Sequence, residues 1–353
     1  MPQIDKLPHT LNNLIKAHFK KRELADIQVS PLTPDGSDRI YYRISSFGYD
    51  PVIAVDAKGT GLHKNHPSTI SQNQTFILIR EHLENLDFPV PELFSTVHNH
   101  DYYLLQDLGD NSLYNTIKKQ GWSPETIKLY QSILVLLLNL QIVAKEKFDP
   151  SWCYAGGYYN RQLIHEHELN YFLKAFVVGY CEININHDIT SKLQNQFNTI
   201  LDAATGAPGD FFLYRDFQSK NLMLKEQKIF LIDFQGARLG PYYYDLAALI
   251  NDPYIDMPWP LREQLKIYYF NKLQSHLNTG APEVETFSYF FSLFSLIRTL
   301  QTLGAFGYLV TRNKMHFKAY IKPALKNLHY YTDMLSEHHN LQTLKSLLQK
   351  IQL

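Results

Sequence analysis

The sequence predicts an α+β fold with two lobes, a small mixed N-terminal lobe with an antiparallel sheet and a larger, mainly helical C-terminal lobe. Two observations predict it. Short strand-like runs with alternating apolar residues dominate the first third of the chain, and helical apolar periodicity dominates the rest. We place the boundary after residue 106, giving an N-lobe at 1–106 and a C-lobe at 107–353. A chain of 353 residues is long enough for two such lobes.

The N-lobe elements follow one another at short spacing. An apolar helical pattern covers about 10–26, and Pro89-Val90-Pro91 ends a second helix that starts near Ser71. Five runs have strand character, and the first two flank an Asp-Gly-Ser turn at 35–37. The predicted strands are 27–32, 40–44, 51–55, 93–97 and 102–106. Residues 107–109 then form the predicted hinge between the lobes.

The C-lobe pattern is helical except for one short all-strand insertion. Helices are predicted at 126–143, 163–178, 260–276 and 287–310. Between the second and third, an apolar run at 211–213 enters a polar loop, and a hairpin with strands 222–224 and 229–232 leaves it. This insertion carries the most informative residues of the chain.

The loop and hairpin space three polar residues as phosphoryl-transfer enzymes do. Asp216 is followed five residues later by Asn221, and Asp233 stands at the end of the next strand. In such sites the first aspartate accepts or orients the proton of the attacking hydroxyl, while the asparagine and the second aspartate bind Mg2+ on the ATP phosphates. A lone aspartate is more often a turn or helix-cap residue, but three residue types and two spacings agree here.

Composition narrows the class of substrate. The 34 basic and 34 acidic residues balance, so there is no electrostatic footprint for nucleic acid or for an anionic membrane. We expect a small-molecule substrate, with no nucleic-acid and no membrane partner. The polar start of the chain and the lack of a later long uncharged run predict a cytoplasmic protein. Two cysteines, Cys153 and Cys181, are expected to be reduced packing residues.

Taken together, these segments resemble the aminoglycoside-phosphotransferase and choline-kinase-like family, which has a protein-kinase-like two-lobed fold. Within it, the chain is most similar to the cell-wall sugar kinases that phosphorylate the anomeric hydroxyl of N-acetylmuramate and N-acetylglucosamine. The resemblance runs over nearly the whole chain. Its carriers are 35–43, 55–57, 104–109, 214–221 with 232–235, 240–247 and 300–306.

The resemblance implies ATP and Mg2+ as cofactors and assigns roles by motif. Asp216 is implied as the catalytic base, and Asn221 and Asp233 as magnesium ligands. Asp245, at the start of an apolar helix, is expected to cap or to bond the catalytic loop and so to belong to the scaffold. Nucleotide contacts are expected from the hairpin turn and the hinge, at Gly36, Ser37, Gln106 and Leu108.

The chain lacks the usual phosphate-binding lysine of the third strand, where Val55 stands. The sugar-kinase branch is similar in this respect. Arg39, Arg43 and Lys58 are the candidate replacements, because guanidinium and ammonium groups both suit phosphate. Each of the three is also compatible with a solvated surface cation.

Glu168 and Arg215 are the candidate substrate contacts. The resemblance places a helix like that of Glu168 near the acceptor, where its carboxylate would bond a sugar hydroxyl or remain solvated. Arg215 is expected to brace the catalytic loop through polar contacts. Lys220 would either neutralise the transferred phosphoryl group or stay exposed. The pattern His165-Glu166-His167-Glu168 does not match a zinc site, which requires histidines four apart on a helix.

Two alternatives stay open. The acceptor could be another small alcohol, such as choline, ethanolamine, a homoserine-like compound or an aminoglycoside. Choline and aminoglycosides are cations, and the sequence of the C-terminal helices has no concentrated acidic cluster that would bind a cation. The chain could also be a regulatory pseudokinase that binds nucleotide. The missing lysine supports that interpretation, and the intact Asp216, Asn221 and Asp233 oppose it.

Overall fold

The structure is a computed structural model and describes residues 4–19, 26–33, 39–58, 70–97, 99–277 and 280–351. By internal contacts the chain forms two compact units. Unit 1 contains Met1–Ser112, Phe148–Gly157 and Asn221–Ala237, and unit 2 contains Leu113–Lys147, Tyr158–Lys220 and Arg238–Leu353. The hairpin after the catalytic loop therefore groups with the N-terminal unit. The lobe boundary after residue 106 stays a prediction.

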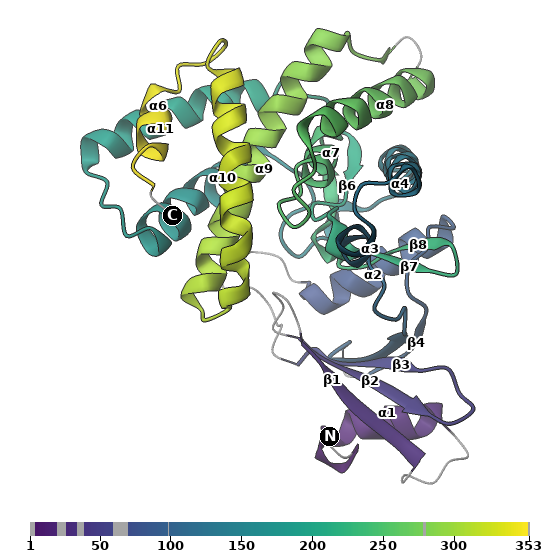
Figure 1. Cartoon of the computed structure of the whole chain (residues 1–353). Helices are drawn as coiled ribbons and strands as arrows, with labels where there is room; N and C mark the ends of the chain where they lie inside the picture. Colours follow the sequence, from purple (N-terminus) through teal and green to yellow (C-terminus); the bar gives the residue numbers. More distant parts are fainter. Residues whose placement is uncertain are drawn as a thin grey trace. The chain divides into compact units, whose positions relative to one another are not determined.

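Unit 1 is built on a five-stranded antiparallel sheet in the order β1-β2-β3-β5-β4, as the alternating runs predict (Figure 1). The strands are β1 (Ile27–Leu32), β2 (Ile40–Ser46), β3 (Val52–Asp56), β4 (Leu93–Val97) and β5 (Tyr102–Gln106). Its remaining elements are η1 (Ile4–Lys6), α1 (His9–His18), α2 (Gln72–Asn85), η3 (Pro150–Trp152), β7 (Leu222–Lys225), β8 (Lys228–Leu231) and η7 (Phe234–Gly236).

One face of the sheet is covered by α1 (Figure 1). Leu11 and Ile15, one helical turn apart, are fully buried against the inward side chains of the strands, among them Ile44 and Leu104. The second helix of this unit, α2, begins at Ser71, whose side chain accepts the backbone N–H of Gln74 at 3.1 Å. The helical spacing of apolar residues therefore explains how α1 packs, and the Ser71 N-cap explains where α2 begins.

Unit 2 is mainly helical. Its helices are α3 (Leu113–Gln120), α4 (Pro124–Val143), α5 (Arg161–Ile164), the π-helices η4 (His165–Leu169) and η5 (Phe172–Tyr180), α6 (His187–Ala204), α7 (Tyr243–Ile250), α8 (Trp259–Leu277), α9 (Val284–Thr311), η9 (Met315–Phe317), α10 (Lys318–Leu335) and α11 (Gln342–Leu348). Two short strands, β6 (Phe211–Leu213) and β9 (Arg238–Gly240), pair antiparallel. The short η6 (Ser219–Asn221) crosses the sequence boundary between the units.

The central helix of unit 2 is α9, which packs against α7, α10 and η5 (Figure 1). Two glycines allow it to approach η5 closely. A Cβ atom on Gly304 would lie 2.8 Å from the Tyr171 ring, and one on Gly307 would lie 2.9 Å from the Ala175 carbonyl oxygen and 3.0 Å from the Phe176 Cα. The facing segment is π-helical, a rare geometry that is frequent at functional sites.

Among the described residues, α4 and α9 are long and apolar enough to cross a membrane by length and composition alone. Both helices contain charged residues, Glu125 and Lys128 in α4 and Glu285 and Arg298 in α9, so neither is the long uncharged run that the sequence lacks. Within their most apolar windows, 44% of α4 and 78% of α9 is buried in the protein. The apolar residues of α9 are explained by its packing inside unit 2, as in a core helix of a globular domain.

We predict that Gly307→Ala destabilises the protein. The new methyl group would meet backbone atoms of η5, and overpacking of this kind costs about 1–3 kcal/mol, more than the helix propensity gained from alanine. Gly280→Ala is the matched control, because nothing lies within 4 Å of its Cβ position. Chemical unfolding of both variants measures the difference, and equal stability of the two would contradict the account.

Candidate active site

The catalytic loop follows β6 in unit 2 and is held by a buried carboxylate of α7. The backbone N–H of Tyr214 donates to Asp245 Oδ2 at 2.6 Å, and that of Arg215 donates to Oδ1 at 2.8 Å. Burial raises the pKa of Asp245 to about 7, against the opposing effect of these two bonds. The structure confirms Asp245 as a scaffold residue of the loop.

A second buried carboxylate holds the other end of the loop. Asp252 accepts the backbone N–H of Ser219 at 2.8 Å and that of Tyr254 at 2.9 Å. Between the two anchors, Arg215 adopts the left-handed region with φ 80°, which is costly for a residue with a Cβ atom. The anchors keep this strained backbone in place, and Asp216 follows directly.

Asp216 faces arginines. Arg298 Nη1 donates to its Oδ1 at 3.1 Å, and Arg215 Nη1 lies 3.8 Å from its Oδ2. Burial alone would raise the pKa of the Asp216 carboxyl, but Arg215, Arg298 and Arg238 hold it below its ordinary value. The carboxylate is therefore ionised at neutral pH, as a group that accepts or orients a proton requires.

Sequence reasoning missed Arg298. Besides Asp216, its Nη1 donates to Gln301 Oε1 at 2.9 Å and to the Tyr244 hydroxyl at 3.3 Å, while Nη2 donates to Gln218 Oε1 at 3.4 Å. A signal was present, because Arg298 is the one cation within the apolar 28-residue span of α9. A buried arginine in such a helix needs hydrogen-bonding or ion-pairing partners, but the sequence does not identify them.

Glu168 lies in the π-helix η4 and is fully buried. Both of its carboxylate oxygens lie 3.0 Å from the Tyr244 hydroxyl, which donates to them. Burial raises the pKa of Glu168 to about 7, although Arg215 and Arg298 oppose that shift. Its predicted contact with a sugar hydroxyl stays a prediction, since in this structure the carboxylate binds Tyr244.

Lys220, between Asp216 and Asn221 in sequence, is enclosed by aromatic rings of unit 2. Its ammonium group lies 4.2 Å from the centre of the Tyr254 ring and between 5.2 and 5.7 Å from the other three. These three are Tyr114, Phe317 and Tyr320. Cation–π attraction of this kind holds an ammonium group in place. The lysine is thus part of a packed cluster of the loop.

Beside the loop, unit 2 has a small polar pocket that Gln218 and Arg298 share with α7, α9 and α10. Asn251, Asn327, Thr299 and Thr302 supply its other polar groups. Among the described residues that line it there is no carboxylate. The pocket therefore offers amides, hydroxyls and one guanidinium group.

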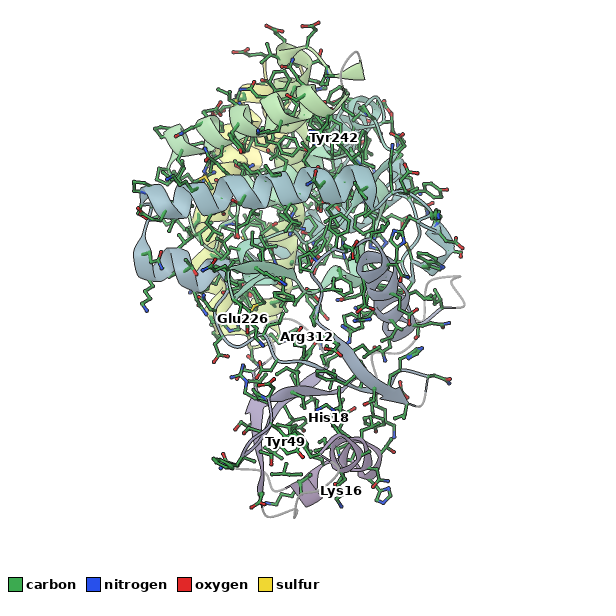
Figure 2. The ribbon with its side chains drawn as sticks, turned by 90° about the vertical axis from the view of Figure 1, so that its right-hand side faces the viewer. Lys16, His18, Tyr49, Glu226, Tyr242 and Arg312 are labelled. Atoms are coloured by element: carbon green, nitrogen blue, oxygen red, sulfur yellow. The ribbon has the colours of Figure 1, made fainter. Side chains whose placement is uncertain are left out.

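Unit 1 carries the two predicted metal ligands at one end of a hairpin. β7 and β8 pair from Leu222 with Leu231, and the Ile232 N–H donates to the Asn221 carbonyl at 3.1 Å. Asn221 and Asp233 therefore stand at the open end, opposite the turn that contains Glu226 (Figure 2). Amide and carboxylate oxygens fit Mg2+, which takes few protein ligands.

Asp233 is exposed and has a left-handed backbone, with φ 66°. Gln235 Nε2 donates to its Oδ1 at 2.6 Å, which orients the carboxylate. The ring of the next residue, Phe234, stacks on Phe76 of α2 at 5.1 Å. Gln235, in the position where many kinases have glycine, thus braces the predicted metal ligand.

The three candidate replacements for the lysine differ in their surroundings. Arg39 is buried, and its Nε and Nη2 donate to Asn73 Oδ1 of α2 at 3.4 and 3.2 Å. Burial lowers the pKa of Arg39, but neighbouring tyrosines and the Asp233 carboxylate outweigh it and raise the pKa above its ordinary value. Asn73 was not anticipated from the sequence as the partner of Arg39.

Arg43 and Lys58 are placed differently. Arg43 Nε donates to Asp107 Oδ2 at 2.5 Å, and its Nη2 donates to Asp110 Oδ1 at 2.8 Å, so its guanidinium ties β2 to the predicted hinge. The Lys58 side chain is exposed, and its backbone N–H donates to Asp56 Oδ1 at 3.0 Å. All three assignments to phosphate stay predictions.

The other expected nucleotide contacts lie at the hinge and in the first hairpin. Gln106 ends β5, where its N–H donates to the Glu92 carbonyl at 2.9 Å, and Leu108 is buried. The hinge turns at Gly109, whose φ is 75° and whose N–H donates to Asp107 Oδ1 at 2.8 Å. Gly36 and Ser37 lie outside the described residues.

Comparison with known proteins agrees with this arrangement of motifs. A model of the phosphotransferase enzyme family known as APH matches residues 62–277. The chain belongs to this phosphotransferase family. The match spans both the predicted hinge and the catalytic loop with its hairpin, so it covers Asp216, Asn221 and Asp233.

Relatives and solved structures support the same family. The chain is 24% identical over 307 residues to an N-acetylmuramate/N-acetylglucosamine kinase of Neisseria meningitidis serogroup B, covering 86% of this chain and 84% of that protein. It is 23% identical over 291 residues to one of Pseudomonas aeruginosa, covering 82% and 79%. The protein is accordingly a small-molecule kinase, a phosphotransferase with an alcohol group as acceptor.

The fold is that of protein-kinase-like enzymes, as predicted. A choline kinase of Cryptosporidium parvum has a TM-score of 0.60 at 12% identity, covering 94% of this chain and 96% of that one. An ADP-bound aminoglycoside phosphotransferase has a TM-score of 0.56 at 12% identity, covering 90% and 97%. At such low identity these likenesses establish the fold alone.

We predict that Glu168 makes the protein less stable as pH rises. The pKa of its carboxyl group is about 7 in the folded protein, against an ordinary value of 4.5. Between these two pH values the folded state binds more protons than the unfolded state. The free energy of unfolding therefore falls as pH rises through this window. In Glu168→Gln this contribution is absent, whereas Asp245 contributes equally to both proteins. Chemical unfolding across the window measures the difference between the two slopes.

Glu166→Gln serves as the matched control, because Glu166 is exposed on the same π-helix. Its stability should follow the wild-type dependence on pH. Identical slopes for wild type and Glu168→Gln would show that the buried carboxyl titrates normally, which contradicts the prediction.

Proposed function

We propose that the protein is an ATP- and Mg2+-dependent kinase that transfers the γ-phosphate to the anomeric hydroxyl of an amino sugar, N-acetylmuramate or N-acetylglucosamine, in cell-wall recycling in the cytoplasm. The names of three relatives, which are 23–24% identical to this chain, support the acceptor. The observation that carries the proposal is the charge around Asp216, where three arginines lower the pKa of the carboxylate.

This charge supports an acceptor that carries no positive charge. A cationic acceptor would approach Asp216 against Arg215 and Arg298, whereas a neutral or anionic sugar would not be repelled. The nearby carboxylates are occupied, since Asp245 and Asp252 bind backbone N–H groups and Glu168 binds a tyrosine. N-acetylglucosamine is neutral and N-acetylmuramate is anionic, so both fit. Choline and aminoglycosides are cations.

The four aromatic rings around Lys220 form a cage that also argues against a choline-like acceptor. Quaternary ammonium ligands are recognised by aromatic rings around the cation. Here the four rings around Lys220 hold an ammonium group that belongs to the chain itself. This cage is therefore taken, which argues against its use for a choline-like acceptor.

In the proposed reaction Asp216 orients the attacking hydroxyl and takes its proton, while the arginines keep the carboxylate ionised until then. Asn221 and Asp233 would hold magnesium through their oxygen atoms, with Gln235 orienting Asp233. Bound magnesium would offset the charge that develops on the phosphates. Asp245 and Asp252 fix the loop throughout.

The first test is incubation of the pure protein with ATP, Mg2+ and separate pools of amino sugars, amino alcohols and aminoglycosides, with mass detection of products. A sugar 1-phosphate from N-acetylmuramate or N-acetylglucosamine is expected. Product from a cationic pool would overturn the acceptor assignment and keep the kinase. ATP binding without transfer to any acceptor would favour the regulatory alternative. Fractionation of cells that express a tagged chain tests the location.

We predict that Asp216→Asn lowers kcat by about 10²–10⁴-fold, because the amide cannot accept the proton. Steady-state kinetics with the acceptor identified above measures the loss. Thermal unfolding provides the control for folding, since the amide is close in size to the carboxylate. Full turnover by a folded variant would contradict the role of Asp216.

We also predict that Arg39, of the three candidates, binds the nucleotide phosphates, because it lies within electrostatic reach of the predicted magnesium ligand Asp233. Arg39→Gln should weaken ATP binding by about 10–100-fold, the worth of a hydrogen bond to a charged group, and leave adenosine binding unchanged. Calorimetry with both ligands separates phosphate from base contacts.

Lys58→Gln is the matched control, because it removes an exposed cation of the same unit. Its ATP and adenosine affinities should equal those of wild type. A phosphate-specific loss in Lys58→Gln, with none in Arg39→Gln, would assign the phosphates to Lys58 instead.

A further inference from the structure

The side chain of Arg298 is buried in unit 2, yet it carries a full charge. Burying a guanidinium group is costly unless its donors are paired, and α9 itself offers only Gln301. The other hydrogen-bond partners of Arg298 among the described residues come from outside the helix, namely Asp216 and Gln218 of the catalytic loop and Tyr244 of α7. Arg298 therefore links α9 to the catalytic loop and to α7.

We infer that Arg298 is a positioning residue that holds the Asp216 carboxylate in its reactive orientation, and that the buried Glu168 holds Arg298 through Tyr244. The inference rests on the proposed role of Asp216. The chain of contacts runs from Glu168 to the Tyr244 hydroxyl at 3.0 Å, from there to Arg298 Nη1 at 3.3 Å, and on to Asp216 Oδ1 at 3.1 Å. The planar guanidinium group fixes the plane in which the Arg298 donors point toward Tyr244 and Asp216.

The residues packed around Arg298 hold its contact with Asp216 in place. Gln301, one turn along α9, accepts from Nη1, and Gln218 in the loop accepts from Nη2. The Tyr244 ring also lies 5.5 Å from the guanidinium carbon, within the range of cation–π attraction. Because these partners belong to packed elements, the carboxylate cannot rotate freely while Arg298 is in place. Precise placement of a reacting group is worth up to about 10²-fold in rate.

The charges that face Asp216 come from four elements. Arg215 lies in its own loop, Arg298 in α9 and Arg238 in β9, and all three favour the ionised carboxylate. Asp245 of α7 is the like charge that faces it. Removing Arg298 leaves fewer cations to oppose the burial of Asp216, so its carboxyl group should bind a proton at higher pH than in wild type.

The test compares Arg298→Gln, Arg298→Lys and wild type over a range of pH, with the acceptor that wild type phosphorylates. Arg298→Gln should lower kcat by about 10²-fold and leave the acceptor KM within about threefold. The acid limb of its kcat/KM profile should move to higher pH. Arg298→Lys should restore part of kcat and part of the acid limb, because the charge returns without the planar fork.

Arg312→Gln is the matched control. Arg312 (Figure 2) caps the C-terminal end of the same helix and is exposed. Its guanidinium carbon lies 5.2 Å from the centre of the Tyr308 ring. Its kcat and pH profile should equal those of wild type. A loss in Arg298→Gln that is confined to the acceptor KM, or that leaves the acid limb unmoved, would overturn the inference and make Arg298 a binding group only.

A double-mutant cycle separates this inference from the proposed function. Unfolding free energies of Asp216→Asn, Arg298→Gln and the double variant require no turnover. Non-additive changes are expected, since the two side chains are in direct contact. If wild type phosphorylates no acceptor, the proposed function fails while the cycle still decides the pairing, and additive changes would overturn the inference.

Discussion

The site in unit 2 depends on the two hydrogen bonds that the buried Asp245 accepts from the backbone of the catalytic loop. They cross from α7 to the loop and hold Arg215 in a left-handed conformation that its side chain disfavours. Because the peptide is fixed there, the next side chain, Asp216, can point in only a few directions. The position of Asp216 is therefore set by backbone contacts, and its charge is then set by arginines.

Close packing around α9 brings the rest of the charge network together. Gly304 and Gly307 let η5 and the residue before it lie directly against this helix, and the buried Glu168 lies in η4, just before η5 in the chain. Glu168 binds Tyr244 of α7, the helix that also supplies Asp245. The arginines of the unit favour the ionised forms of Glu168 and Asp216, and these carboxylates in turn favour the charged form of Arg298.

The parts of this protein that are local in sequence could be predicted from sequence. Alternation gave β1–β3 and β5, and the spacing of Asp216, Asn221 and Asp233 predicted phosphoryl transfer, which the family membership supports. The long-range contacts could not be predicted in this way. Arg298 lies 82 residues from Asp216, and no periodicity links the two positions.

The π-helices and the aromatic cage around Lys220 could not be predicted from the sequence either. Residues 163–178 have ordinary helical periodicity, and this periodicity does not distinguish the bonding pattern of a π-helix from that of an α-helix. The cage of Lys220 takes rings from α3, the segment after α7, η9 and α10, which only the tertiary fold assembles. Likewise Asn73 could be found as the partner of Arg39 only once the chain was folded.

The central claim is that the arginines around Asp216 select a neutral or anionic sugar. The most direct measurement compares kcat/KM for N-acetylglucosamine and for glucosamine at a pH where the glucosamine amine is protonated, because the two share one ring and differ in charge and the acetyl group. The account predicts a clear preference for N-acetylglucosamine that narrows as pH rises and the amine loses its proton. An equal or higher kcat/KM for the cationic sugar would contradict it.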